Sequence, residues 1–127
     1  MQPNTHLGID HALCGAPGQL APGQATASFT TTAVMAADDK GLVHGGFVFG
    51  LADHAAMLAV NDPNVVLGSA STRFLAPVAV GQTVVATARV LEEKGRKRVV
   101  EVACRVGDTL VLSGELVCFV LDGHVLG

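Results

Sequence analysis

One acidic residue, Asp53, interrupts the most apolar stretch of the chain, which runs from Phe47 to Val60. No Lys or Arg lies within one helical turn of Asp53 on either side. Burying a carboxylate is unfavourable unless it is paired or hydrogen-bonded, and burial raises its pKa and therefore its basicity. Such a carboxylate is suited to the activation of water. The alternative is a structural acid whose oxygens accept hydrogen bonds from the backbone or from a Ser or Thr of the sheet.

Two glycines, Gly45 and Gly46, follow His44 and open this stretch. The first N–H groups of a helix have no partner within it and carry partial positive charge. Glycine at this point lets a carbonyl oxygen approach the backbone closely, as an oxyanion hole requires. Asp53 follows Gly45 by eight residues, which is about 12 Å along a helix. A single reacting carbon therefore cannot contact both residues within one chain.

The elements that must position these residues follow from the hydrophobic pattern. The helix is predicted to end near Asn61, before the stop signal Asp62-Pro63. Alternating apolar and polar residues predict strands at 24–33, 65–75, 83–91, 99–106 and 110–120. Nearer the N-terminus, residues 6–13 predict one helical turn leading into a short strand, and turns are expected at Pro17, Gly18, Pro22 and Gly23.

One apolar helix needs a curved sheet to cover it, so we expect a single α+β domain over residues 1–127. In this fold a long buried helix is wrapped by an antiparallel sheet of about five to six strands. A single sheet also leaves an open edge, which favours edge-to-edge dimerisation.

Composition narrows the class of protein. The formal net charge of -3 argues against nucleic acid as the main partner. No apolar run reaches the ~18 residues of a membrane span, and the N-terminus lacks the pattern of a secretory signal. We therefore expect a cytoplasmic protein with no membrane partner.

The cysteines are expected to be reduced and mostly buried: Cys14, Cys104 and Cys118. Neither His44 nor the pair Asp53-His54 has metal-ligand spacing, so no metal is expected, and His54 is expected at a polar edge of the helix.

The run His44-Gly45-Gly46 with Phe49, Leu51, Ala52 and Asp53 resembles the helix motif of the hotdog-fold acyl-CoA thioesterases of the phenylacetate-degradation (PaaI) type. The later Arg73-Phe74-Leu75, with Pro77 and Gly81, resembles that family's next strand and turn. The likeness covers roughly residues 7 to 120. It implies a hotdog fold, dimers that often pair into tetramers, and hydrolysis of an acyl-CoA or aryl-CoA thioester. CoA is then part of the substrate, and no cofactor is expected.

The resemblance also implies a role for each residue of the motif. Asp53 would be the nucleophile or the general base. Gly45 or Gly46 would supply the oxyanion-hole N–H, and His44 would fix the turn or act directly. Sites of this family lie at the dimer interface, with the acid of one protomer facing the glycine of the other. Two positions depart from the family: Asp38 stands where relatives carry Asn or Gln, and Met57 where some carry Thr or Ser.

Several residues are weaker candidates for contacts with substrate or CoA. Asp38 precedes the oxyanion motif by a few residues. Arg96 and Lys97 belong to a basic hairpin that could hold the CoA phosphates, although a solvated turn beside two glutamates explains it slightly better. Arg73 is an alternative phosphate contact. Ser69 and Ser71 could reach the helix acid across the sheet, and no G-x-S-x-G elbow makes either a nucleophile.

Two other functions remain open. A hotdog enoyl-CoA hydratase or dehydratase would use Asp39 and His44, whose spacing is similar to the D-x-N-P-L-H motif of that family. Gly41 and Leu42 replace its Asn and Pro, and Asp53 is left without a role. A non-catalytic acyl-CoA-binding module is the third possibility.

Overall fold

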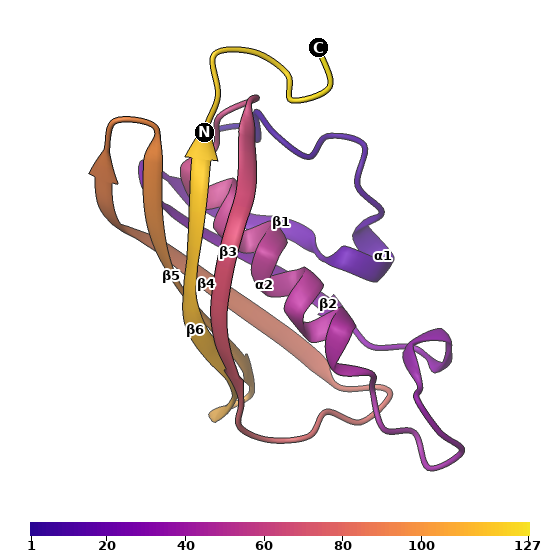
Figure 1. The fold of residues 1–127 in the computed structure, drawn as a ribbon. Helices are drawn as coiled ribbons and strands as arrows, with labels where there is room; N and C mark the ends of the chain where they lie inside the picture. The colour runs from indigo at the N-terminus through magenta and orange to yellow at the C-terminus, as the bar shows by residue number, and fades with distance from the viewer.

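A computed structural model describes residues 1–127 as one curved antiparallel sheet wrapped around a long helix (Figure 1). The helix is α2 (Gly45–Val60), preceded by the short helix α1 (His11–Cys14) and the 3-10 helix η1 (Ala33–Met35). The strands are β1 (Ala16–Ala21), β2 (Gln24–Thr30), β3 (Val65–Phe74), β4 (Thr83–Lys94), β5 (Lys97–Val106) and β6 (Thr109–Val120). Their order in the sheet is β1-β2-β4-β5-β6-β3. This is the predicted α+β hotdog fold.

Helix α2 forms the centre of the core. It begins at the predicted double glycine and ends at Asn61, which adopts the left-handed conformation at φ 53° and donates its N–H to the Met57 carbonyl at 2.8 Å. The helix face toward the sheet is rich in small residues, which lets the backbone lie close to β2, β4 and β5. The fully buried apolar residues of α2 are Leu51, Ala52, Ala55, Ala56, Met57, Leu58 and Ala59. They pack against the inward-facing residues of the sheet, among them Val84, Ala86, Val100, Val102 and Leu116.

The sheet has two unequal edges. Strand β1 spans six residues, contains Pro17, and shifts register between Pro17 and Leu20. The predicted turn at Pro17 and Gly18 is therefore wrong. An edge strand can hold a proline that a central strand cannot, because one side of its backbone needs no partner. Strand β3 spans ten residues without proline and forms the other edge.

The other predicted strands lie where the pattern placed them, and the ends of β2, β4 and β5 are shifted. Strand β2 stops at Thr30, because the buried Thr31 turns away and its hydroxyl donates to the Ala79 carbonyl at 2.9 Å. Strands β4 and β5 run further than expected, up to the turn at Gly95. No helix combines the length and apolar character needed to cross a membrane.

Residues 1–14, here called the N-terminal strap, run along the side of α2 that the sheet leaves open (Figure 1). The strap is fastened at the end of the helix by one side chain. The Asn61 amide accepts a hydrogen bond from the Asn4 N–H at 2.7 Å and donates to the Gln2 carbonyl at 3.0 Å. Asp10 then caps α1, accepting from the N–H of Ala12 at 2.9 Å.

Candidate active site

The Asp53 carboxylate lies on α2 with one oxygen, Oδ1, fully buried and without a hydrogen-bond partner. The alternative of a structural acid satisfied by the backbone or a sheet hydroxyl is therefore wrong for this oxygen. Burial raises the pKa of Asp53 above its usual value, and the charge of His6 partly opposes that rise. An ionised Asp53 is for this reason a stronger base than a solvated aspartate.

The double glycine forms the start of α2 as predicted. No hydrogen bond within the protein uses the N–H of Gly45 or Gly46, so both donors are free. A side chain at Gly46 would place its Cβ only 2.9 Å from Nε2 of His44, whose ring folds back over the helix start. His44 is exposed, makes no capping hydrogen bond, and meets the ring of Phe47 edge-on at 6.1 Å.

An apolar hollow of about 380 Å³ opens beside Gly45. Its lining comes from the loop before α2, the first turns of α2, the end of β3 and the loop after it: Val43, Gly45, Val48, Phe74, Leu75, Ala76, Pro77, Val78 and Val111. Phe74 and Leu75 are half exposed there. The hollow offers an uncharged surface at the helix end where the free N–H groups lie.

His54, which follows Asp53, is buried, so the prediction that it lies at a polar edge of the helix is wrong. His54 is only 1% exposed, and its Nδ1 lies 3.3 Å from the Cys14 carbonyl. The rings of His6 and His11 stack against it, with centroids 5.9 Å and 6.5 Å away. The N-terminal strap provides these groups, and burial lowers the pKa of His54. The helix pattern alone carries no sign of the strap that covers this face.

The candidate contacts of strand β3 do come together, but away from Asp53. Ser69, Ser71 and Arg73 line a surface hollow of about 460 Å³ with residues of β6, including Glu115. Neither serine reaches the Asp53 Oδ1. Asp38 is engaged in its own loop, because its Oδ1 accepts from the N–H of Lys40 at 2.9 Å and of Leu42 at 3.1 Å.

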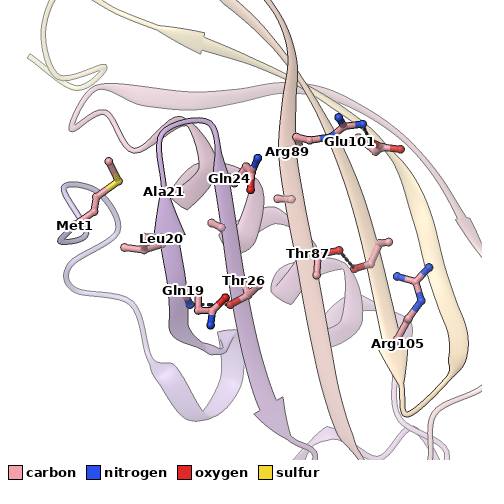
Figure 2. A pocket seen from close by; sticks show the side chains of 13 residues that line it. Met1, Gln19, Leu20, Ala21, Gln24, Thr26, Thr87, Arg89, Glu101 and Arg105 are labelled. Atoms are coloured by element: carbon pink, nitrogen blue, oxygen red, sulfur yellow. Dashed lines mark hydrogen bonds and ion pairs between the residues drawn. The ribbon is translucent and has the colours of Figure 1, made fainter.

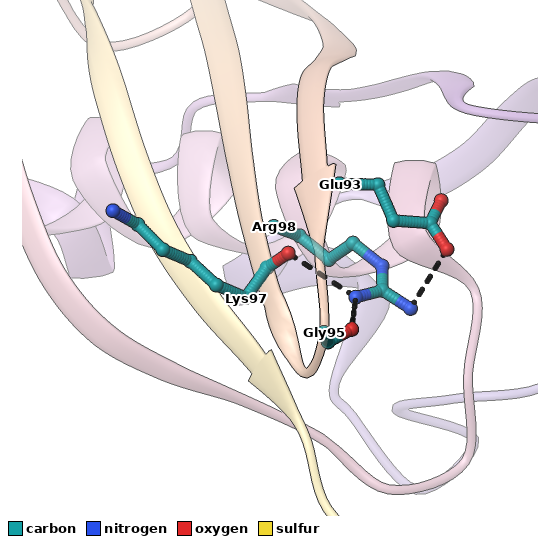
Figure 3. Close-up of polar contacts among 4 residues, drawn as sticks. All are labelled: Glu93, Gly95, Lys97 and Arg98. Atoms are coloured by element: carbon teal, nitrogen blue, oxygen red, sulfur yellow. Dashed lines mark hydrogen bonds and ion pairs between the residues drawn. The ribbon is translucent and has the colours of Figure 1, made fainter.

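The basic hairpin is largely neutralised by the chain itself (Figure 3). Arg98 pairs with Glu93 at 3.1 Å and donates to the Gly95 carbonyl at 2.7 Å. Arg96 pairs with Asp122, and Lys97 is exposed with no ion pair. Lys97 aligns with Phe119 and so with the start of β3, whereas Gly45 contacts the end of β3 at Phe74. The hairpin therefore lies at the opposite end of α2 from the double glycine.

A larger hollow, of about 840 Å³, lies on the outer face of the sheet and contains none of the predicted site residues (Figure 2). It crosses β1, β2, β4 and β5, and the exposed ion pair of Arg89 and Glu101 lies within it at 3.0 Å. It is separated from Asp53 and from Gly45 by the sheet. Size alone therefore does not identify the site that the chemistry indicates.

Comparison with known proteins assigns the family. Residues 40–113 match the model of the Thioesterase superfamily, and this segment holds the double glycine, Asp53 and β3. A crystal structure of an uncharacterized protein from Pyrococcus horikoshii is 47% identical, with a TM-score of 0.99 over 100% of this chain and 98% of that chain. The PaaI protein of the E. coli phenylacetic acid degradation operon is 27% identical, with a TM-score of 0.80 over 89% of this chain and 83% of that chain. The chain belongs to the Thioesterase superfamily, and its likeness to PaaI-type hotdog proteins is confirmed.

Two curated relatives are longer than this chain and are not named as thioesterases. A methylthioribose-1-phosphate isomerase of Aquifex aeolicus is 50% identical over 123 residues, which are 96% of this chain and 27% of that protein. A transcription factor FapR of a Thermoanaerobacter strain is 29% identical over 85 residues, which are 67% of this chain and 42% of that protein. The chain thus spans about a quarter of the first relative and less than half of the second.

Proposed function

We propose that the protein hydrolyses an acyl-CoA or aryl-CoA thioester to the free acid and CoA, with Asp53 as general base or nucleophile. The observation that carries the proposal is the Asp53 carboxylate, whose buried Oδ1 has no partner in a chain of the Thioesterase superfamily. An unpaired buried carboxylate destabilises a core, so its presence is best explained by chemistry.

As a general base, Asp53 accepts a proton from water while the water oxygen attacks the thioester carbonyl carbon. The carbonyl electrons move to oxygen, and the oxyanion accepts hydrogen bonds from the free N–H groups of Gly45 and Gly46. When the carbonyl re-forms, the C–S bond breaks and the CoA thiolate takes the proton from Asp53. As a nucleophile, the Asp53 carboxylate would instead attack the carbonyl carbon itself. The C–S bond breaks, CoA leaves as its thiolate and takes a proton from solvent, and water then hydrolyses the mixed anhydride to the free acid and the Asp53 carboxylate.

We propose that each such site is shared between two copies of the chain. Asp53 and Gly45 are eight residues apart on one helix, about 12 Å, and one carbon cannot contact both. Strand β3 is the better edge for pairing two copies, because it is longer than β1 and contains no proline. Pairing about a two-fold axis would extend the sheet and bring a second helix into the assembly.

The remaining parts of the substrate would use surfaces already described. The apolar hollow beside Gly45 is suited to the acyl or aryl group. Arg73, Ser69 and Ser71 offer a polar hollow for part of CoA. In the basic hairpin, Lys97 lacks an ion pair and could bind phosphate without first losing one.

A non-catalytic acyl-CoA-binding module is the second candidate, because one matched relative is a transcription factor. A hydratase using Asp39 and His44 is less well supported, since both side chains are exposed in or beside a loop while Asp53 would have no role.

The experiment is a panel of acyl- and aryl-CoA esters, including hexanoyl-CoA, benzoyl-CoA and phenylacetyl-CoA, with a thiol-detecting reagent. Wild-type protein should release thiol from at least one ester, and Asp53→Asn should lower kcat by about 100-fold or more. Asp39→Ala is the matched control and should keep the activity. Thiol release that survives Asp53→Asn overturns the mechanism. Saturable binding without turnover favours the binding module, and hydration of crotonyl-CoA that depends on Asp39 favours the hydratase.

A further inference from the structure

Phe74 is a large apolar side chain that the fold leaves uncovered beside the start of α2. It aligns with the buried Leu112 of β6, and aligned residues of antiparallel strands point to the same face of a sheet, so the Phe74 ring lies on the helix side. The ring is nevertheless 57% exposed, because α2 begins at Gly45 and supplies no earlier turn to cover it. Three ring atoms, Cε1, Cδ1 and Cζ, would lie 3.2, 3.5 and 3.8 Å from a Cβ added to Gly45. Exposed apolar surface next to free backbone donors is the combination that ligand pockets use.

The hollow beside Gly45 has a buried floor and an exposed rim. The floor, as the term is used here, consists of four buried valines: Val43, Val48, Val78 and Val111. The Val43 N–H donates to the Val78 carbonyl at 2.8 Å, and the Leu75 N–H donates to the Val111 carbonyl at 2.8 Å, so the backbone around the floor is held in place. The rim consists of Phe74 and Leu75, whose side chains are more than half exposed. The size of the hollow can therefore be changed at the rim without disturbing the core.

The lining of the hollow decides which half of a thioester it can hold. A carbonyl group bound to the Gly45 N–H has the acyl chain on one side of its carbon, and sulfur with the pantetheine arm of CoA on the other. No residue of the lining has a polar side chain, so the amides of the pantetheine arm would lose water there without gaining partners. An apolar chain gains about fourfold in affinity for each methylene that it buries. The hollow therefore fits the acyl group and excludes the CoA arm.

We propose that Phe74 determines the acyl specificity of the protein: its ring is the wall that limits the hollow to a short or medium-length apolar acyl group. This inference rests on the proposed function, because it places the acyl part of the same thioester. A cavity of about 150 Å³ holds one benzene ring. The hollow, at about 380 Å³, then has room for an acyl group of up to about ten carbons, with part of the space left for the carbonyl group and the open rim.

The first experiment measures kcat/KM for acetyl-, hexanoyl-, decanoyl- and tetradecanoyl-CoA, each below its micelle-forming concentration. In the wild-type protein kcat/KM should rise with chain length up to about decanoyl and gain nothing beyond it. Phe74→Ala should raise the ratio of tetradecanoyl to decanoyl at least about tenfold, and Phe74→Trp should lower the ratio of decanoyl to hexanoyl by a similar factor. Leu91→Ala, which removes an exposed leucine far from the hollow, is the matched control and should leave both ratios unchanged. A Phe74→Ala variant that loses activity equally on all four esters would overturn the proposal.

The second experiment tests the uncharged lining. Succinyl-CoA has the chain length of butanoyl-CoA and ends in a carboxylate, for which the hollow has no partner. Its kcat/KM should be at least about tenfold lower than that of butanoyl-CoA. Equal values for the two esters would show that the acyl group lies outside the hollow.

Binding measured in the Asp53→Asn background separates this inference from the proposed function. Isothermal titration calorimetry with the same esters should give dissociation constants that follow the chain-length order, and adding Phe74→Ala should shift that order toward longer chains. If the order shifts while the wild-type protein releases thiol from no ester, the proposed hydrolysis fails and the acyl site stands. If the esters are hydrolysed and Phe74→Ala keeps the wild-type order, the hydrolysis stands and the role of Phe74 fails. Binding of none of the esters would overturn both.

Discussion

The ring of Phe74, at the end of strand β3, lies directly over Gly45 at the start of helix α2. A Cβ added to Gly45 would stand 3.2 Å from Cε1 of Phe74, closer than an ordinary van der Waals contact. The ring leaves the Gly45 N–H free, since no group of the protein accepts its hydrogen bond. The end of an edge strand thus lies against one of the two backbone donors that the proposed reaction uses.

Gly45→Pro should remove this donor and keep the helix. Gly45 is the first residue of α2, where proline is well tolerated because its missing N–H has no helical partner. The preceding His44 has φ -63° and ψ 128°, which is compatible with a following proline. We expect kcat to fall about 100- to 1,000-fold in a thiol-release assay. Gly45→Ala keeps the N–H, displaces only the exposed Phe74 ring, and should retain most of the activity. Equal losses in both variants would assign the effect to crowding.

Mixing two inactive variants should restore activity if the site is shared. Co-expressed Asp53→Asn and Gly45→Pro chains form mixed dimers in which one of the two sites has both residues intact. Random pairing makes about half of all dimers mixed, so about one quarter of the wild-type activity is expected. The control replaces the second chain with the double variant and should give no activity. A mixture with no activity above that of the separate variants would show that each site lies within one chain.

A lysine on the β3 edge should weaken the proposed dimer. Ala70 is exposed in the middle of β3, and a charge there is the usual way in which proteins prevent edge pairing. We expect Ala70→Lys to raise the dimer dissociation constant at least tenfold in analytical ultracentrifugation, and to lower the activity with it. Ala16→Lys places the same charge on the exposed edge strand β1 and should leave the assembly unchanged. A wild-type protein that is monomeric at micromolar concentration would contradict the shared site.

Asp53→Asn should make the folded protein more stable near neutral pH. Burial raises the pKa of Asp53 in the folded state above that in the unfolded chain. The folded state therefore binds this proton more tightly, and the stability gained from it is lost as pH rises through the folded-state pKa. At pH 7 the variant should melt a few degrees higher than the wild type, and the difference should shrink at pH 3, below the ordinary aspartate pKa of about 3.9. A variant that melts lower at pH 7 would mean that the carboxylate stabilises the core.

Much of the fold could be predicted, because its signals are local. The helix from the double glycine to Asn61 and the four long strands follow from periodicity, and burial then follows the pattern in β4, where Val84, Ala86 and Ala88 face inward. The proline in β1 misled the prediction, since proline at a sheet edge and proline in a turn have the same local sequence signal.

The surroundings of Asp53 could be predicted only in part. Its position in an apolar helix is visible in the sequence, whereas the strap is held by bonds between residues 57 and 59 positions apart. Contacts between residues so far apart in the sequence produce no hydrophobic periodicity, so the sequence does not predict the burial of His54 or the stacking of His6 on it. The pairing of Arg96 in the basic hairpin is not visible in the sequence for the same reason, because its partner Asp122 lies far along the chain.

The two hydrogen bonds between the Asn61 side chain and the N-terminal strap have a practical consequence for work with the purified protein. One amide side chain both follows the last turn of the central helix and binds the backbone of Gln2 and Asn4, only two residues before His6. An affinity tag fused ahead of Met1 would strain these two hydrogen bonds and loosen the strap that covers His54. A tag at the C-terminus, or one removed by a protease before assay, keeps an effect of the tag from being taken for a lack of activity.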